Sequence, residues 1–182
     1  FHERGIRAFE ARGFPGAREE AWRKTNLRPV TAEHFPLADS QGVAPKELIE
    51  RLGDLGDSYR LVFVDGRLAA DLSDLADLAN GLTVTPFSEY DGNPPERLVA
   101  ALGAHADIDW HPFVALNSAF FVDGAYIHVA RGAMIEKPIA VTHITTAEAD
   151  RRAIYPRLVV EAEDGAEVRV VERFIGDDQA GA

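Results

Sequence analysis

The chain has 182 residues, no cysteine and a formal net charge of −11. Without cysteine, these residues form no disulfide, thiolate zinc site, cysteine-held cluster or cysteine nucleophile. The negative charge argues against a surface that neutralises nucleic acids or anionic membranes. The sequence has no apolar run near the roughly 18 residues of a membrane span and no signal-peptide-like start, so we expect a soluble cytoplasmic protein.

The first forty residues predict short helices joined by turns and loops. Apolar residues on one face predict a helix over 1–12, ended by Gly13. A second short helix is expected over 17–24, where acidic residues come first and basic residues last, as the helix dipole favours. We expect Trp22 to anchor this segment to the core. Prolines and a glycine predict a loop over 28–43.

The middle of the chain predicts a small α+β region. Its expected elements are a helix over 45–52, a strand, turn and strand over 60–68, a brief strand over 83–85 and a helix over 94–103. Three leucines at a spacing of three, Leu72, Leu75 and Leu78, suggest either a short helix or loop side chains that cover a sheet edge. We therefore interpret residues 1–115 as an N-terminal α+β cap region.

Three short apolar runs follow, over 119–122, 126–129 and 139–144, and each is too short for a helix. Asp123-Gly124 and Arg131-Gly132 separate them, and glycine tolerates the positive φ that tight turns need. Their β-branched and aromatic residues favour strands. We therefore predict that a β-rich body begins near residue 116 and extends to 182.

Residues 158–174 alternate between apolar and polar side chains on both sides of Asp164-Gly165. This period of two predicts strands with one buried and one wet face. An Asp-Gly pair between two such runs most often forms a β-hairpin. A coil of a β-solenoid that turns at the same glycine is the less common alternative.

Several of these segments resemble one protein family. The stretch LNSAFFVDGAYIHVARG (116–132), followed by EKPIAVTHIT, is similar to the SufB/SufD family of the SUF iron-sulfur cluster assembly machinery, and to its SufD subunits in particular. LVFVDG (61–66) resembles the first strand and turn of that family, and Arg18, Glu20, Trp22, Arg23, Thr25 and Leu27 resemble its early R-x-E-x-W-(K/R)-x-T-x-L pattern. Lys24 departs from the usual tyrosine. The resemblance implies a right-handed parallel β-helix whose first coils occupy 116–182, after the small α+β region.

The resemblance also implies a role. A SufD-like chain is a non-catalytic scaffold subunit that associates with a SufB-like subunit and two copies of a SufC-like ABC ATPase. The assembled complex would handle the iron-sulfur cluster and the ATPase would bind ATP, so no cofactor is expected in this segment. The histidine implicated in cluster assembly lies beyond the matched region, so no functional residue is carried over. We expect the chain to be truncated, because two or three coils are about the minimum for a solenoid and would leave an open strand edge.

Polar residues that resemble catalytic or metal sites have simpler interpretations. Asp107, Asp109 and His111 form D-x-D-x-H, which offers metal ligands but is more typical of a turn. His128 is expected to face solvent, and His143 to be a hydrogen-bonded core residue. The carboxylates of Glu161, Glu163, Asp164 and Glu167 are expected to line a solvated strand face. No phosphate-binding P-loop occurs, so the chain is not expected to be the ATPase. We assign no catalytic, cofactor-binding or metal-binding residue.

Two other functions remain open on the sequence. Parallel β-helices also carry carbohydrate-active sites built from carboxylates, for which Asp107, Asp109, Glu161 and Glu163 are the candidates. Alternatively, the chain is a structural module that forms a homodimer through its β edges. Neither nucleic acid nor a membrane is an expected partner.

Overall fold

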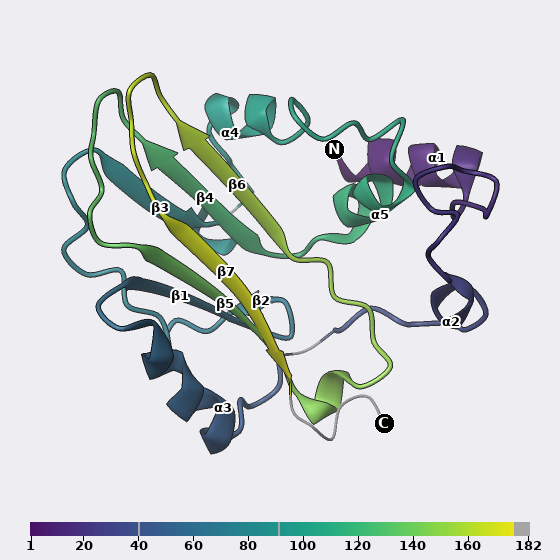
Figure 1. Cartoon of the computed structure of the whole chain (residues 1–182), viewed down its shortest axis with the longest axis horizontal. Coiled ribbons are helices and arrows are strands. Elements are labelled where there is room, and N and C mark those ends of the chain that lie inside the picture. Colours follow the sequence, from purple (N-terminus) through teal and green to yellow (C-terminus); the bar gives the residue numbers. More distant parts are fainter. Residues whose placement is uncertain (40, 91, 177–182) are drawn as a thin grey trace.

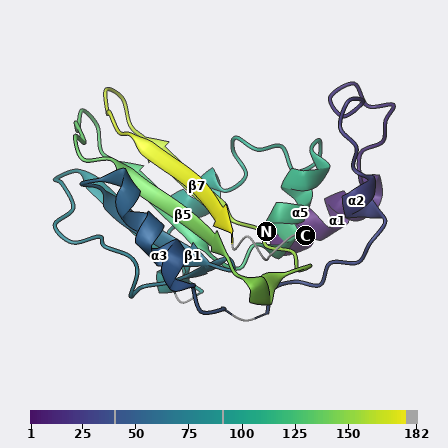
Figure 2. The same cartoon turned by 60° about the horizontal axis from the view of Figure 1, so that its bottom comes forward.

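The computed structural model describes residues 1–39, 41–90 and 92–176. Its helices are α1 (His2–Arg12), α2 (Arg28–Thr31), α3 (Lys46–Glu50), α4 (Glu96–Ala101) and α5 (Pro112–Phe120), with 3-10 turns at Arg51–Leu55, Phe87–Tyr90 and Ala147–Ala149. Its strands are β1 (Tyr59–Val64), β2 (Arg67–Leu68), β3 (Leu82–Pro86), β4 (Gly124–Val129), β5 (Ile139–Thr145), β6 (Arg157–Ala162) and β7 (Val170–Gly176). Two sheets lie one above the other, with helices around them (Figures 1 and 2).

Each sheet is mixed. The four-stranded sheet has the order β2-β1-β5-β7, in which β1, β5 and β7 are parallel and β2 is antiparallel to β1. The three-stranded sheet has the order β3-β4-β6, in which β3 is antiparallel to β4 and β6 is parallel to it. Among the described residues, β6 and β7 each have a strand neighbour on one side only. Both sheets therefore end in an open strand edge.

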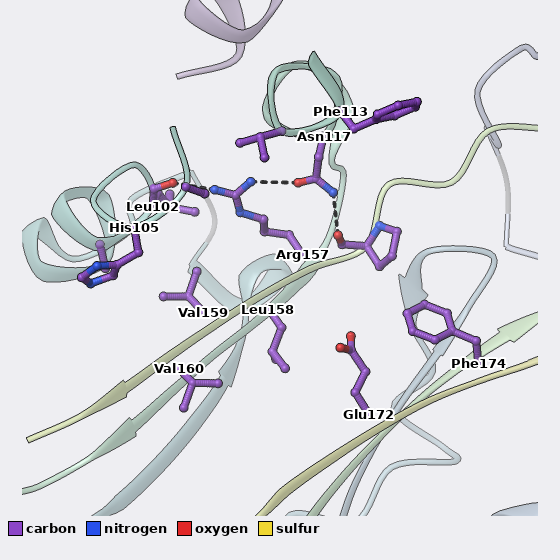
Figure 3. A pocket seen from close by; sticks show the side chains of 14 residues that line it. Leu102, His105, Phe113, Asn117, Arg157, Leu158, Val159, Val160, Glu172 and Phe174 are labelled. Carbon is purple, nitrogen blue, oxygen red and sulfur yellow. Dashed lines mark hydrogen bonds between the residues drawn. The ribbon is translucent and has the colours of Figure 1, made fainter. Parts of the chain in front are cut away.

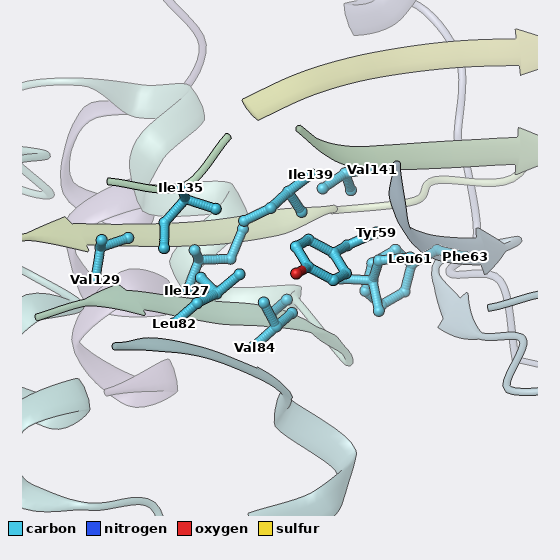
Figure 4. Close-up of a cluster of buried hydrophobic side chains, with 11 residues drawn as sticks. Tyr59, Leu61, Phe63, Leu82, Val84, Ile127, Val129, Ile135, Ile139 and Val141 are labelled. Atoms are coloured by element: carbon cyan, nitrogen blue, oxygen red, sulfur yellow. The ribbon is translucent and has the colours of Figure 1, made fainter. Parts of the chain in front are cut away.

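The main core lies between the two sheets (Figure 4). Alternate residues of each strand point into it, because successive side chains of a strand face opposite ways. Its buried members are Tyr59, Leu61, Phe63, Leu82, Val84, Ala125, Ile127, Val129, Ile135, Ile139 and Val141. The loop side chains of Leu75 and Leu78 pack against this cluster without forming a helix, which confirms the second interpretation of the leucine spacing.

Helices cover the outer faces of both sheets. Leu48 of α3 and Leu52 of the following 3-10 turn pack against Val62, Val64 and other side chains on the outer face of the four-stranded sheet. Leu98 of α4 packs with Tyr126 of the three-stranded sheet. Strands β1, β4 and β5 are therefore buried on both faces, which explains why their sequences read as continuous apolar runs rather than as alternation.

Helices α1 and α5 pack tightly against each other at one end of the molecule (Figure 1). The contact is close because Gly5 is buried, and a Cβ at this position would lie 2.6 Å from the Ala119 nitrogen. Nearby, the indole of Trp22 packs on Phe113, with ring centroids 4.9 Å apart. Trp22 is half-buried. It therefore anchors the N-terminal segment to α5 and not, as the sequence predicted, to the core, since neither ring belongs to a buried cluster.

Two buried aspartates hold loops to the sheets. Asp65 accepts hydrogen bonds from the Gly42 nitrogen and from the nitrogen and hydroxyl of Thr146, at 2.8 to 2.9 Å. Asp123 accepts bonds from the backbone nitrogens of Leu68 and Ser88. Each aspartate thus satisfies backbone donors of segments distant in sequence. Asp65 also starts the Asp65-Gly66 turn, whereas the turn expected at Asp123-Gly124 does not form, because Gly124 is already the first residue of β4.

The right-handed parallel β-helix expected from the family resemblance is wrong. The described residues form two small mixed sheets with helices on their outer faces, and each sheet begins with an antiparallel pair. Asp65-Gly66 reverses the chain into β2, which a succession of parallel coils does not do. The antiparallel pairing of β3 with β4 has the same effect in the second sheet.

Three local predictions are also wrong. The expected strand over 119–122 overlaps α5, because Pro112 starts a helix whose turns bury Ala115 and Ala119. The hairpin that the local pattern at Asp164-Gly165 favours when taken alone, and that the family resemblance had set aside, does not form, since β6 pairs with β4 and β7 pairs with β5. Residues 17–24 form turns, not a helix.

The remaining helices and strands overlap the predicted segments, except that α2 adds one turn to the expected loop and that the strand expected directly after Asp164-Gly165 begins only at Val170. The boundary expected at residue 115 falls inside α5. The sheets combine strands from both sides of it, since β1 pairs with β5 and β3 pairs with β4. Residues 177–182, the end of the predicted β body, lie outside the described ranges.

Candidate functional site

An open groove of about 610 Å³ lies beside the last strands of both sheets (Figure 3). One wall comes from α5 and the end of α4, and the other from β6 and β7. The labelled side chains around it are Leu102, His105, Phe113, Asn117, Arg157, Leu158, Val159, Val160, Glu172 and Phe174. Its lining combines the polar side chains of His105, Asn117, Arg157 and Glu172 with apolar side chains of α4, α5, β6 and β7. The groove adjoins the open edges of β6 and β7.

Arg157, the first residue of β6, organises one end of the groove (Figure 3). Its guanidinium donates hydrogen bonds to Asn117 Oδ1 at 2.9 Å and to the Leu102 carbonyl at 2.5 Å. The rings of Phe1 and Phe121 lie 5.6 and 5.9 Å from its Cζ, within the range of cation–π contacts. Burial lowers the pKa of Arg157 from its usual value. Arg157 therefore ties α4 and α5 to β6 and sets the shape of the wall.

Asn117 completes this arrangement from α5. Its Nδ2 donates to the Pro156 carbonyl at 2.6 Å, while its Oδ1 accepts from Arg157. Because one amide satisfies both groups, the helix is fixed to the residue that precedes β6. Neither Asn117 nor Arg157 was predicted from the sequence as a site residue. No local motif marks them, since they lie 40 residues apart and meet only in the fold.

A stack of three rings crosses the other sheet and ends at the groove. Phe63, His143 and Phe174 are register partners on β1, β5 and β7. The His143 ring lies 5.4 Å from Phe63 and 4.7 Å from Phe174, and both pairs are nearly parallel. Its Nε2 lies 2.9 Å from a Glu172 oxygen. His143 is buried, so the predicted hydrogen-bonded core histidine is confirmed.

We expect His143 to make the protein less stable as the pH falls. Burial lowers the pKa of His143, although its bond to Glu172 opposes the shift. In the unfolded chain the histidine has its usual pKa of 6.5. When the pH falls below 6.5, the unfolded chain therefore binds a proton at this residue more readily than the folded protein does. The free energy of unfolding should fall as the pH drops from 7.5 to 5.5. His143→Phe should show a smaller fall, measured by urea denaturation at both values.

The His143→Phe comparison separates this histidine from the carboxylates, which are present in both proteins. Phenylalanine keeps a flat ring between Phe63 and Phe174 and removes the titrating nitrogens, together with the bond to Glu172. Equal pH dependence in the two proteins would contradict the prediction.

A polar cluster occupies the outer face of the three-stranded sheet beneath α4. Arg97 of α4 donates to Glu161 at 2.9 Å and to Glu163 at 2.7 Å. The Tyr126 hydroxyl donates to Glu161, and His128 Nε2 lies 3.0 Å from Glu163. The two glutamates therefore hold α4 to the sheet. Glu161 and Glu163 therefore lie on the outer face of the sheet, as the sequence predicted. They are not simply solvated, however, because both carboxylates accept side-chain hydrogen bonds.

The cluster shifts the ionisation of its members strongly. Hydrogen bonds from Arg97 and His128 lower the pKa of Glu163 to about 2. The bond from Tyr126, with those from Arg97, also lowers the pKa of Glu161. Burial and the bond to Glu161 raise the pKa of Tyr126. Both carboxyl groups are therefore ionised at neutral pH, so neither is suited to act as a general acid.

We expect Glu163 to contribute stability that is lost in acid. Its pKa in the folded protein lies below its usual 4.5, so its contribution is complete above pH 4.5 and disappears as the pH falls toward 2. Glu163→Gln should make the acid unfolding curve shallower in this range. Circular dichroism during acid titration would measure it. Glu167→Gln is the matched control, because among the described residues the Glu167 side chain makes no hydrogen bond, whereas Glu163 accepts bonds from Arg97 and His128. If the two variants gave identical acid unfolding curves, the proposed role of Glu163 would be refuted.

The D-x-D-x-H residues form a turn before α5. Asp107 accepts bonds from the backbone nitrogens of Asp109 and Trp110, and Asp109 pairs with Arg4 at 2.6 Å. His111 precedes the first residue of α5. In the described part of the chain, no group of three or more His, Asp or Glu side chains is arranged to hold a metal ion.

His128 lies on the outer face, as expected, but its side chain is only 19% exposed.

No helix among the described residues is both long and apolar enough to cross a membrane.

The fold and the groove define a two-sheet α/β protein with open strand edges beside an open groove. Comparison with known proteins gives its family. A model of the SufBD protein N-terminal region matches residues 2–141, so the chain belongs to this family.

Relatives from three organisms agree with this assignment. The chain is 29% identical over 162 residues to an iron-sulfur cluster assembly SufBD family protein of Synechocystis, a match that covers 88% of this chain. It is 28% identical over 170 residues to the iron-sulfur cluster assembly protein SufD of Escherichia coli, and 25% identical over 179 residues to the chloroplastic protein ABCI7 of Arabidopsis thaliana, with 92% of this chain covered in each case. The matches cover 35 to 37% of these proteins, so the chain spans about a third of their length.

Proposed function

We propose that this chain forms part of a non-catalytic scaffold subunit in an iron-sulfur cluster assembly complex. The observation that carries the proposal is the family match over residues 2–141. The names of the Synechocystis and E. coli relatives, which describe iron-sulfur cluster assembly proteins, support the same process for this chain. The likeness to SufD favours the SufD type of subunit. The predicted cytoplasmic location remains part of this proposal.

The proposed partners are a SufB-like subunit and a SufC-like ABC ATPase. Two features are suited to binding other polypeptides: the open edges of β6 and β7, and the groove beside them. Backbone groups at an open edge pair readily with another strand. In this proposal the cluster is the cargo of the complex and ATP is hydrolysed by the partner. These residues contain no cysteine and would contribute a rigid surface.

A carbohydrate-active enzyme has less support. That alternative rested on a parallel β-helix, which the two mixed sheets exclude. Its candidate carboxylates also have other bonds, since Glu161 and Glu163 hold Arg97 and Asp109 holds Arg4. A glycosidase needs one carboxyl group with a raised pKa, whereas the pKa values of Glu161 and Glu163 are lowered.

Co-expression tests the scaffold proposal. The full-length protein would be purified through an affinity tag together with the SufB-like and SufC-like proteins from the same organism, and the mass of the complex measured by light scattering. We expect the three proteins to elute together with two copies of the ATPase. Elution of this protein alone would overturn the proposal.

Self-association is a second candidate, which the two open strand edges favour. Neither β6 nor β7 contains proline or lysine, residues that natural edges use against pairing. A dimer through these edges would appear in light scattering as a mass that rises with concentration. A single monomer mass at high concentration would refute it.

A further inference from the structure

The N-terminal segment carries a positive charge in an acidic chain. Residues 1–31 contain seven lysines and arginines and four acidic residues, a net charge of +3, whereas the whole chain carries −11. Four of these cations form ion pairs, for example Arg12 with Glu19 and Arg23 with Glu20. Among the described residues, Arg18, Lys24 and Arg28 have no recorded ion pair. Positive charge is therefore left uncompensated in this segment.

Two of these unpaired cations line one pocket. Its volume is about 450 Å³, within the usual range for small-molecule sites. Arg23, Lys24 and Arg28 lie around it, together with the hydroxyl-bearing residues Thr25 and Thr31. None of the described residues that line it carries a carboxylate. The pocket therefore combines cationic and neutral hydrogen-bond donors without an internal counter-ion.

Trp22 gives the same pocket an apolar wall. The indole packs on Phe113, which holds it in place, and also lines the pocket. A ligand that fits this surface has an anionic group for the cations and an organic part for the indole. Lysine, arginine and hydroxyl groups are the usual donors to phosphate oxygens in proteins. A phosphate ester satisfies both requirements.

We propose that this pocket binds a small phosphorylated molecule, with the phosphate held by Lys24 and Arg28 and the organic part against Trp22. The pocket lies in the N-terminal turns and α2 and shares no lining residue with the groove of Figure 3, although Trp22 packs on Phe113, which lines that groove. The inference does not depend on the scaffold role. Failure of the co-purification experiment would leave it intact.

Calorimetric titration of the full-length protein with AMP tests the proposal at low salt. Ribose 5-phosphate and adenosine serve as comparison probes. We expect AMP to bind, ribose 5-phosphate to bind more weakly because it lacks the base, and adenosine not to bind measurably. Lys24→Gln combined with Arg28→Gln should weaken AMP binding about tenfold, which two exposed charge pairs can provide. The side chains of Lys24 and Arg28 are both exposed, so the double variant should keep its fold, and circular dichroism would check this.

Arg18→Gln is the matched control. It removes the same charge from the same segment, but Arg18 does not line the pocket. We expect this variant to bind AMP like the unaltered protein. An equal loss with Arg18→Gln would show general charge attraction and overturn the proposal. The proposal would also be overturned if adenosine bound as tightly as AMP. If a pentaglutamate peptide displaced AMP at a lower concentration than AMP itself requires, the result would overturn the proposal in favour of an acidic peptide ligand.

Discussion

Replacing Gly124 with alanine is expected to lower the free energy of unfolding by about 3 kcal/mol or more. A Cβ at this position would lie 1.9 Å from the Arg157 carbonyl oxygen and 3.0 Å from the Phe87 ring. The first of these contacts is with backbone, so it is not relieved by a side-chain rotation. Strands β4 and β6 would have to move apart where Gly124 pairs with Arg157.

Urea denaturation would measure the loss, with Gly53→Ala as the matched control. A Cβ at Gly53 would meet no atom within 4 Å, so the same substitution there should leave stability nearly unchanged or slightly raised. Equal unfolding midpoints for the two variants would show that β4 and β6 are not in close contact at Gly124. The result would also test the groove, because Arg157 is the residue displaced.

Phe63→Ala should cost about 3 to 5 kcal/mol of stability. The Phe63 side chain is 2% exposed in the core between the sheets, and its ring packs on His143. Truncation would leave a cavity and remove one side of the ring stack. Fluorescence-monitored urea unfolding would give the change in free energy, provided that the m-value is unchanged.

Phe174→Ala is the control for this prediction. Phe174 lies at the other end of the same stack but is 65% exposed, so its truncation removes less buried surface. We expect a loss below about 1 kcal/mol. A loss as large as that of Phe63→Ala would mean that something covers β7 in solution, which would bear directly on self-association.

Local sequence signals located most of the elements. Apolar β-branched runs and the Asp65-Gly66 turn predicted β1, β2 and β4, the period-two pattern predicted β6, and glycine at residue 13 ended α1 as expected. These signals involve residues close in sequence, so a single chain reveals them. The local signals failed where the same apolar residues are compatible with both a strand and a helix. The apolar run at 119–122 has strand-forming residues, yet the proline at 112 and the packing of α1 place its first half in a helix.

The candidate site could not be predicted because it is built from distant segments. Arg157 meets Leu102, Asn117 and Phe1, which come from three helical segments. Glu161 and Glu163 were recognised as an acidic strand face, but Arg97 is more than 60 residues away. An alternating pattern predicts which side chains face outward. It does not predict which helix will cover them.

The sequence by itself determined the family, the turns at Gly66, Gly132 and Gly165, and the burial of His143. Family membership follows from motifs, and the parity of His143 with Ile139 and Val141 places it on the inner face of β5. Only the tertiary structure decided the sheet order and the groove. Strand pairing joins segments as far apart as β1 and β5, and its direction depends on packing of whole faces rather than on any local pattern. For this reason the family resemblance led to a β-helix, whereas the residues form two mixed sheets.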